Sequence, residues 1–583
     1  MGPGRWENDM AESGTRSPRA ARRGRRGAPT PSGVHATVEP DRAPPGRRRS
    51  RRRVLATVLV ALALVAAGVG CGSGSDEAAN GSPDTEAGGP PPQPGGQLVV
   101  AVPVLEPETA LRLTLEPLTT FAADGSVAPY LAESVEPNET FDRWTIRVRP
   151  GIEFHNGEAL DADAVKANLD TYSVSELYST DPFAPVVSTT VVDDLTVEVE
   201  LAQPWASFPA HLTAEQSDGT GLMVAPESVE KLGSLFLANP GVDDLYGTGP
   251  FILDEADPAA DTWTARKNPS YWQEGLPYVD EVEIQAVLEG SSRLAGVTSG
   301  ELDVTLSSDP PDDPGDLRVI SQEGELQVLA VALNTRQPPF DDPDLREAMA
   351  LATDVEALAE TAGIDPALLA SGPFRPGSPW ADGSERPPFD PDRARQLVAD
   401  VEEANGPVSI RLGAQELEVE NVAVQQALAD QWRDVGVDVE LSVVNPSMQT
   451  ATLLVAGDFD AVLGRVFGLP DPDLYYFWWH SSALRTEDKP VGYNYVGIDD
   501  PALDEALDEV RATPDEEQRQ DALRTVQERL AETQPYLWLW ATRWSAVANQ
   551  RVHGLGDAPL PDGGTRMALV GPRLDLEAVW IER

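Results

Sequence analysis

The sequence contains little cysteine, histidine or lysine, and each shortage excludes a class of protein. Its 583 residues include a single cysteine, Cys71, so the chain forms no internal disulfide and lacks the thiolates of a structural zinc cluster. The five histidines lie at positions 35, 155, 211, 480 and 553, and their spacing matches no metal-binding motif. Gly-x-Ser-x-Gly, His-Glu-x-x-His and phosphate-loop motifs are also absent. The sequence therefore predicts no catalytic residue, metal site or cofactor.

Basic residues are scarce outside the N-terminal segment. Residues 1–53 contain 14 Arg, no Lys and 5 acidic residues, whereas the remainder contains 30 basic and 91 acidic residues. Nucleic acids and anionic membrane surfaces attract proteins of the opposite charge, so neither is an expected partner. A composition of 41% hydrophobic and 24% charged residues is typical of globular proteins. The length predicts two or three domains.

The sequence has one long apolar run, Val54–Gly70, which contains 17 uncharged residues. It follows the basic cluster Arg47–Arg53 and ends at Cys71, an order typical of an export signal. A permanent transmembrane helix is the alternative, because about 17–25 residues span a bilayer. The position of Cys71 resembles that in a bacterial lipoprotein signal, in which the cysteine is lipidated and becomes the mature N-terminus. Gly68 departs from this pattern, which prefers Leu there.

Two features flank this signal. Ser50–Leu55 resembles a twin-arginine export motif, and the general secretory route is the alternative. Residues 72–96 are rich in Gly, Ser and Pro, a composition typical of a flexible tether. We therefore expect an exported protein on the outer face of the cytoplasmic membrane, anchored by a lipid at Cys71.

From residue 97 onward, hydrophobic residues recur alternately with the periods of strands and helices. Alternation over residues 144–149, 195–201 and 282–288 predicts half-buried strands. Asp-Pro pairs at 342–343, 390–391 and 500–501 predict helix starts, with a capping acid before a proline at the first helical position. An apolar stripe over residues 345–355 predicts one helix, and residues 513–516 read as a capping box before another. The mixture predicts an α/β protein with more than one lobe.

Several short motifs follow one another in a fixed order. They comprise Tyr130–Ser134, Trp144–Arg149, Phe154–Glu158, Gly247–Phe251, Asn268 with Tyr271–Trp272, Leu333–Thr335, Pro339–Asp341, Leu345–Ala348 and Ser371–Trp380. In this order they resemble the peptide-type class of extracytoplasmic solute-binding proteins, bacterial extracellular family 5. Asn156 departs from the usual Phe-His-Asp-Gly of that family.

The resemblance implies an α/β, two-lobed periplasmic-binding-protein-like fold (type II, class C) with an extra inserted domain and a ligand cleft between the lobes. Residues 1–71 would be the signal and 72–96 the tether. Domain I would comprise residues 97–124, 235–335 and 537–583, domain II residues 125–234, and domain III residues 336–536.

The same resemblance implies a monomeric binding protein that delivers a small ligand, foremost a peptide, to the permease subunits of an ABC importer. Nickel complexes, heme, opines and oligosaccharides are alternative ligands in the family. A secreted two-lobed peptidase or glycosidase is the alternative of another class, and the missing enzyme motifs argue against it.

The resemblance also places residues 465–473 beside the ligand. Peptide binders of the family often carry an Asp three residues before Asp-Pro, where it pairs with the α-ammonium of the peptide. Gly468 occupies that position here. Because a buried ammonium needs an anionic partner, Glu106 or Glu108 would supply the charge, or the ligand lacks a free amine. Arg465 would suit an anionic ligand group.

Five further residues are expected at the cleft by resemblance: Asn334, Phe467, Trp478, His480 and Asn494. The aromatic run 475–479 has the alternative interpretation of a buried core. His155 is interpreted as part of a hydrogen-bonded turn rather than as a catalytic residue or metal ligand.

The predicted anchor can be tested through its cysteine. If Cys71 is lipidated, Cys71→Ala should abolish fatty-acid labelling and move the protein from the membrane fraction into the medium. Fractionation followed by immunoblotting measures this. A variant that stays in the membrane would instead indicate an uncleaved helix at Val54–Gly70.

Overall fold

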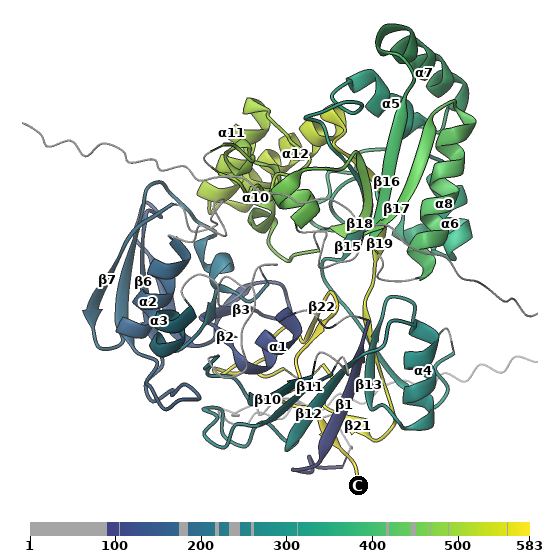
Figure 1. Ribbon diagram of the computed structural model, residues 1–583. Helices are drawn as coiled ribbons and strands as arrows, with labels where there is room; N and C mark the ends of the chain where they lie inside the picture. The colour runs from purple at the N-terminus through teal and green to yellow at the C-terminus, as the bar shows by residue number, and fades with distance from the viewer. Residues whose placement is uncertain are drawn as a thin grey trace, which may run out of the picture. The chain divides into compact units, whose positions relative to one another are not determined.

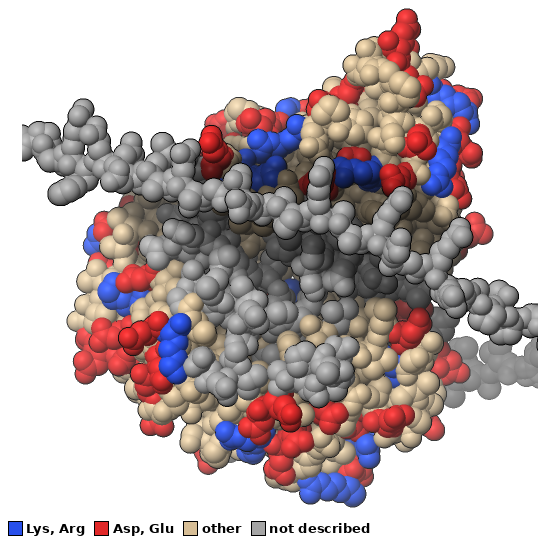
Figure 2. All heavy atoms as spheres, in the orientation of Figure 1, with Lys and Arg blue, Asp and Glu red and all other residues tan. Residues whose placement is uncertain are grey.

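The computed structural model describes residues 90–583, except residues 104, 106, 174–184, 216–220, 233–244, 258–261, 312, 416–418, 445–450, 467, 488 and 557. The signal with Cys71, and the candidate site residues Glu106 and Phe467, lie outside the described residues. Within the described part, no helix is both long and apolar enough to cross a membrane. Acidic and basic side chains are interspersed over the face shown in Figure 2.

The first sheet has seven strands in the order β10-β11-β12-β1-β13-β20-β14 (Figure 1). β1 runs parallel to both β12 and β13, whereas the other neighbouring pairs are antiparallel. Val100 and Val102 pack on the face covered by the C-terminal segment, and Ala101 packs on the opposite face with α4. The elements are β1 (Gln97–Val102), β10 (Phe251–Asp257), β11 (Thr262–Lys267), β12 (Glu281–Ala286), β13 (Val304–Ser307), β14 (Arg318–Ser321), β20 (Ser545–Ala548), α1 (Pro107–Thr114) and α4 (Gly290–Ser299).

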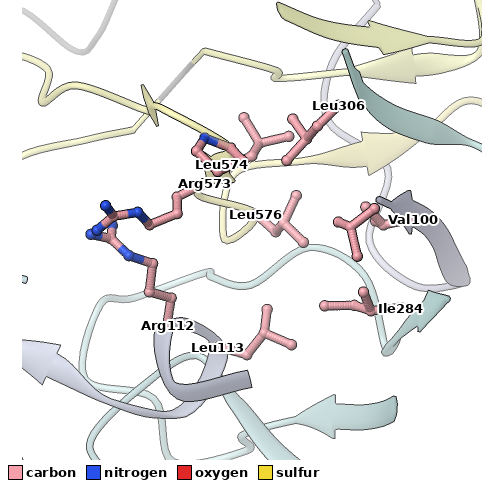
Figure 3. A pocket seen from close by; sticks show the side chains of 10 residues that line it. Val100, Arg112, Leu113, Ile284, Leu306, Arg573, Leu574 and Leu576 are labelled. Atoms are coloured by element: carbon pink, nitrogen blue, oxygen red, sulfur yellow. The ribbon is translucent and has the colours of Figure 1, made fainter. Parts of the chain in front are cut away.

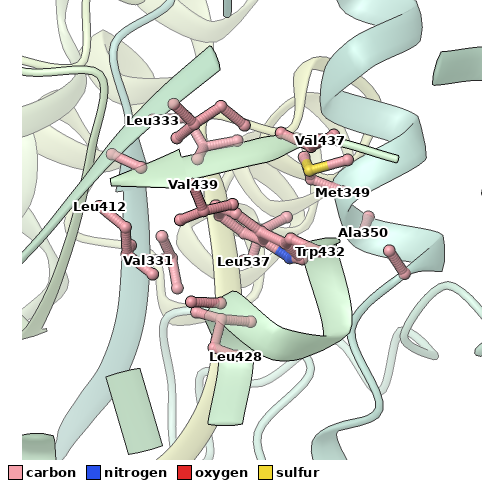
Figure 4. Close-up of a cluster of buried hydrophobic side chains, with 14 of the residues drawn as sticks. Val331, Leu333, Met349, Ala350, Leu412, Leu428, Trp432, Val437, Val439 and Leu537 are labelled. Carbon is pink, nitrogen blue, oxygen red and sulfur yellow. The ribbon is translucent and has the colours of Figure 1, made fainter. Parts of the chain in front are cut away.

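The second sheet has five strands in the order β17-β16-β18-β15-β19 and helices on both faces. In β15, Val331 and its alternate neighbours pack with α5–α8 around the fully buried Trp432 (Figure 4). The intervening residues, including Ala330, pack with α11 and α12. The elements are β15 (Gln327–Leu333), β16 (Ser409–Gln415), β17 (Asp438–Val444), β18 (Ala461–Val466), β19 (Tyr536–Thr542), α5 (Pro343–Leu351), α6 (Val355–Ala362), α7 (Pro391–Asn405), α8 (Val419–Asp434), α10 (Tyr476–Trp479), α11 (Pro501–Ala512) and α12 (Glu516–Thr533).

A third, antiparallel sheet has the strand order β5-β6-β8-β7. Its core includes Trp144, Ile146 and Val148, the residues whose alternation predicted a strand. The elements are β5 (Ala132–Pro137), β6 (Arg143–Val148), β7 (Val186–Asp193), β8 (Thr196–Leu201), α2 (Ala162–Ser173) and α3 (Pro226–Leu232).

The predicted strands are confirmed as β6, β8 and β12, although β12 ends at Ala286, two residues early. The next carbonyls, of Val287 and Leu288, accept hydrogen bonds from the Arg293 side chain instead. The three Asp-Pro helix starts are also confirmed. Each aspartate carboxylate accepts a backbone N–H of the first helical turn.

Two helix predictions were wrong. The stripe over residues 345–355 belongs to two helices, because Asp354 accepts the N–H of Ala357 and starts α6 anew. The capping box was placed two residues too early. Asp515 caps α12 by accepting the N–H of Gln518, while Thr513 accepts the N–H of Asp515 itself. Local spacing does not distinguish these adjacent capping groups.

The chain passes between the first two sheets at two places. Residues 322–326 connect β14 to β15, and residues 543–544 connect β19 to β20. The N–H of Gln322 donates to the carbonyl of Trp544 at 2.8 Å, so the two crossings run side by side. Two short crossings are the kind of connection about which lobes rotate.

Three of the ordered motifs of the sequence meet at one buried carboxylate, Glu116. It accepts hydrogen bonds from the hydroxyls of Tyr271 and Thr248 at 2.7 Å each, and from the indole of Trp272 at 2.8 Å. Tyr130 donates to it at 3.2 Å. Burial raises the pKa of Glu116 to about 7, although these donors oppose the rise. Three motifs far apart in the chain are thus joined at one side chain.

His155 has the structural role predicted for it. Its Nδ1 accepts the N–H of Gly247 at 3.3 Å, and its Nε2 lies 3.0 Å from the carbonyl of Gly249. These contacts require the neutral imidazole, with the proton on Nε2. Burial lowers the pKa of His155 from 6.5 to about 4.

This histidine should make folding pH-dependent. Because its folded pKa lies below its unfolded pKa of 6.5, its stabilising effect is complete above pH 6.5 and is lost as the pH falls toward 4. The expected slope is about 1.4 kcal/mol per pH unit. Denaturant unfolding of wild type and His155→Gln between pH 7.5 and 4.5 measures it as a difference. Equal pH dependence in the two proteins would contradict a neutral, buried His155.

Candidate ligand site

Arg465 lies where the first and second sheets approach each other. It belongs to β18, and its guanidinium donates to Ser308 just after β13 and to Thr542 at the end of β19, both at 3.3 Å. The guanidinium also lies over the ring of Trp544, 5.5 Å from the ring centre. Arg465 therefore contacts the ends of strands from both sheets, beside the two chain crossings.

Gly468 shapes the loop after β18 and has no room for a side chain. Its φ of +86° is in the left-handed region, and a Cβ there would lie 2.4 Å from the backbone nitrogen of Gln327. Its own N–H donates to the hydroxyl of Tyr475. An aspartate at this position would collide with the backbone of β15, so this chain uses the position for a turn.

Trp478, His480 and Asn494 form a separate group around α10. Asn494 is buried and bonds five backbone groups, including the carbonyls of Trp479 and Ile498. His480 accepts the N–H of Ser482, and burial lowers its pKa. Trp478 packs edge-on against Tyr493 and Tyr495.

The aromatic run at 475–479 is mainly core. Tyr475, Tyr476, Phe477 and Trp479 are buried, and only Trp478 is partly exposed. This favours the core interpretation of the run over its alternative as a cleft wall. Asn334 is also buried, and its amide donates to the carbonyls of Gly457 and Phe459. The structure thus places Arg465 and Gly468 together and the other described candidates elsewhere. Glu108 lies in α1, and its side chain is not among those that the structure describes.

The second aspartate of the Asp-Pro-Asp motif binds a distant segment. Asp473 accepts hydrogen bonds from the side chains of Trp205, Ser207 and His211 at 2.6–2.8 Å and from Arg511 of α11 at 2.9 Å. Burial would raise the pKa of Asp473, but Arg511 and His211 hold it well below its usual range. Burial lowers the pKa of His211. This carboxylate fixes residues 205–211 to the helices of the second sheet.

Sequence reasoning missed two arginines, Arg112 of α1 and Arg573 near the C-terminus. Both lie beside a small cavity over β1, β12 and β13, and their guanidiniums point toward each other (Figure 3). Neither residue belongs to a recognisable motif. In the local sequence, only the position of Arg112 between Leu111 and Leu113 could have indicated that its side chain lies close to the core.

The model of bacterial extracellular solute-binding proteins, family 5, matches residues 126–487. The glutathione-binding protein GsiB of Pectobacterium atrosepticum is 24% identical over 468 residues, which are 77% of this chain and 86% of that protein. These relatives are binding proteins.

Two solved structures have the same fold. The oligopeptide-binding protein AppA of Bacillus subtilis, in complex with a nonapeptide, has a TM-score of 0.71 at 19% identity and covers 85% of this chain and 100% of its own. NikZ of Campylobacter jejuni, in complex with Ni(L-His), has a TM-score of 0.67 at 19% identity, covering 82% and 97%.

The packing at Gly468 predicts a stability effect. Gly468→Ala should lower the free energy of unfolding by about 1–2 kcal/mol for the left-handed backbone and by a further 1–3 kcal/mol or so for the collision with Gln327. Gly383→Ala is the matched control, since Gly383 has a φ of +78° and open space around it. Denaturant unfolding of both variants separates the two effects. Equal losses would show that the loop yields to a side chain at residue 468.

Proposed function

Because the chain belongs to the bacterial extracellular solute-binding proteins, family 5, we propose that it captures a peptide outside the cytoplasmic membrane and delivers it to an ABC importer. The family match over residues 126–487 carries the proposal. The arrangement of two sheets joined by two adjacent crossings supports it, because a receptor of this kind signals ligand capture by closing its lobes.

A peptide is the proposed ligand. GsiB is named for glutathione, a tripeptide, and AppA was solved with a nonapeptide. The residues that the structure describes contain no group of three or more His, Cys, Asp or Glu side chains placed to hold a metal ion. Arg465, at the junction of the sheets, is suited to an anionic side chain of the ligand.

The protein acts as a monomeric receptor and not as an enzyme in this proposal. The anchor is a lipid at Cys71, and residues 72–96 allow the folded part to reach the permease subunits while attached to the membrane. Domain I comprises residues 97–124, 235–335 and 537–583, with domain II at 125–234 and domain III at 336–536. The cleft lies between lobes built from these domains.

Native mass spectrometry of gently purified protein, followed by calorimetric titration with short peptides, tests the proposal. Stoichiometric binding without peptide cleavage is the expected result. Repeated turnover that survives re-purification would overturn it in favour of a hydrolase, and failure to bind any peptide would move the ligand to another chemical class.

The ligand's amine should matter little for affinity. Gly468 supplies no carboxylate, and losing one partner of a buried charge pair typically costs about 2–5 kcal/mol. We therefore expect N-acetyl-trialanine to bind within about tenfold of trialanine, as measured by calorimetry. A loss beyond roughly a hundredfold would show that another acid, Glu108 first, pairs with the ammonium group.

A further inference from the structure

A small cavity lies on the face of the first sheet that the C-terminal segment covers (Figure 3). Its volume is about 30 Å³, enough for one or two water molecules or a small alkyl group. The walls are apolar except for the two arginines. The lining residues are Val100, Val102, Arg112, Leu113, Ile284, Leu306, Pro572, Arg573, Leu574 and Leu576.

The two arginines share one acidic ion-pair partner in the part of the chain that the structure describes. Arg112 donates to a side-chain oxygen of Glu215 at 2.9 Å and to the carbonyl of Ala214 at 2.6 Å. Arg573 lies 3.7 Å from that same oxygen of Glu215. The side chains of Arg112, Arg573 and Glu215 are only 12%, 14% and 8% exposed. Among the described residues, the two mostly buried guanidiniums thus share one carboxylate as their direct ion-pair partner, and buried charges are stable when each is paired.

The neighbouring acids are bound to a different arginine. Asp575 and Glu577 follow Arg573 closely in the chain, and both accept hydrogen bonds from Arg566. Asp575 therefore attracts Arg112 only at longer range, and no hydrogen bond from Arg112 or Arg573 to either acid is found among the described residues. Each guanidinium has five N–H donors, so the pair has donors left for a second carboxylate beside Glu215.

The cavity adjoins the region that contains Arg465. Leu306 lines the cavity, and Ser308, two residues later, accepts a hydrogen bond from Arg465. The turn before Arg573 contacts the crossing at residues 322–326. The N–H of Gly571 donates to the side-chain oxygen of Gln322 at 3.2 Å. The lining residues Val102 and Leu306 lie at the carboxyl ends of parallel strands, the edge at which open α/β sheets bind ligands.

We propose that Arg112 and Arg573 bind a carboxylate of the ligand, and that the adjoining cavity takes a small alkyl group next to that carboxylate. The C-terminal alanine of a peptide has this chemistry. Guanidinium groups hold a carboxylate through paired N–H donors, while the apolar walls exclude larger or polar side chains. This inference rests on the proposed function, because it assigns one end of the transported peptide to this site.

Trialanine and its C-terminal amide are the probes for calorimetric titration. In wild type, amidation should weaken binding by roughly 30-fold or more, because a buried charge pair is lost. In Arg112→Gln and Arg573→Gln, the acid should bind little better than the amide. Arg524→Gln is the control, since Arg524 is exposed and pairs with Asp521 on α12, and it should keep the wild-type ratio.

Glu215→Gln gives a result of the opposite sign, which keeps the proposal testable if an arginine variant fails to fold. Removing the competing carboxylate should tighten binding of trialanine and leave its amide unaffected. The proposal is wrong if the ratio of acid to amide affinity is the same in wild type, Arg112→Gln, Arg573→Gln and Glu215→Gln.

Failure of the peptide function can be separated from failure of this site. If wild type binds no peptide, propionate and propionamide probe the cavity alone by NMR titration at millimolar concentration. Propionate binding that is lost in Arg573→Gln would support the carboxylate site without a peptide ligand. Equal behaviour of propionate and propionamide would overturn it.

Discussion

The fold depends on one electrostatic requirement, that a carboxylate removed from water must be surrounded by donors. Glu116 meets it by collecting hydroxyl and indole donors from residues 130, 248, 271 and 272. These donors belong to segments that are up to about 140 residues apart. The carboxylate thus connects Tyr130, just before β5 of the third sheet, to residues 248, 271 and 272, which flank β10 and β11 of the first sheet. If Glu116 or one of these donors were left in the interior without a hydrogen-bond partner, the free energy of unfolding would fall. Three of the motifs that resemble the family are therefore joined by the hydrogen bonds of one side chain.

Asp473 applies the same requirement at a second place. It gathers donors from residues 205–211 and from α11, and Arg511 completes the arrangement by stacking on the ring of Tyr476 with its guanidinium carbon 3.5 Å from the ring centre. The Asp-Pro-Asp motif thus has an architectural role in this chain. Because Trp205 and Phe208 belong to the core of the third sheet, Asp473 joins that sheet to the helices of the second.

The chain combines a large excess of acidic residues with three arginines near the junction of its main sheets. Its acids greatly outnumber its bases, and acidic side chains are spread over the face shown in Figure 2. Arg112, Arg465 and Arg573 lie beside the junction of the two main sheets and the cavity next to it, where Glu215 pairs with two of them. Guanidiniums within an acidic protein attract an anion by local pairing and not by a long-range field. Such a site is consistent with a receptor that reads one charged end of a small ligand.

The sequence by itself determined what depends on neighbours within a turn or a strand. Alternation located β6 and β8, and Asp-Pro pairs located three helix starts, because side-chain direction and capping are local properties. His155 could be recognised as a turn residue from its motif. The ordered motifs also implied the family, although they could not say what they do together.

Only the tertiary structure decided which distant residues meet. It split the stripe at 345–355 into two helices, turned Gly468 against the backbone of β15, and placed Arg112 beside Glu215 and Arg573 across separations of 103 and more residues. Such contacts follow from the pairing order of strands and the burial of whole faces, which minimise the exposed apolar area and the unpaired charge of the entire chain. No local pattern contains that information, because many distant partners satisfy the same local pattern equally well.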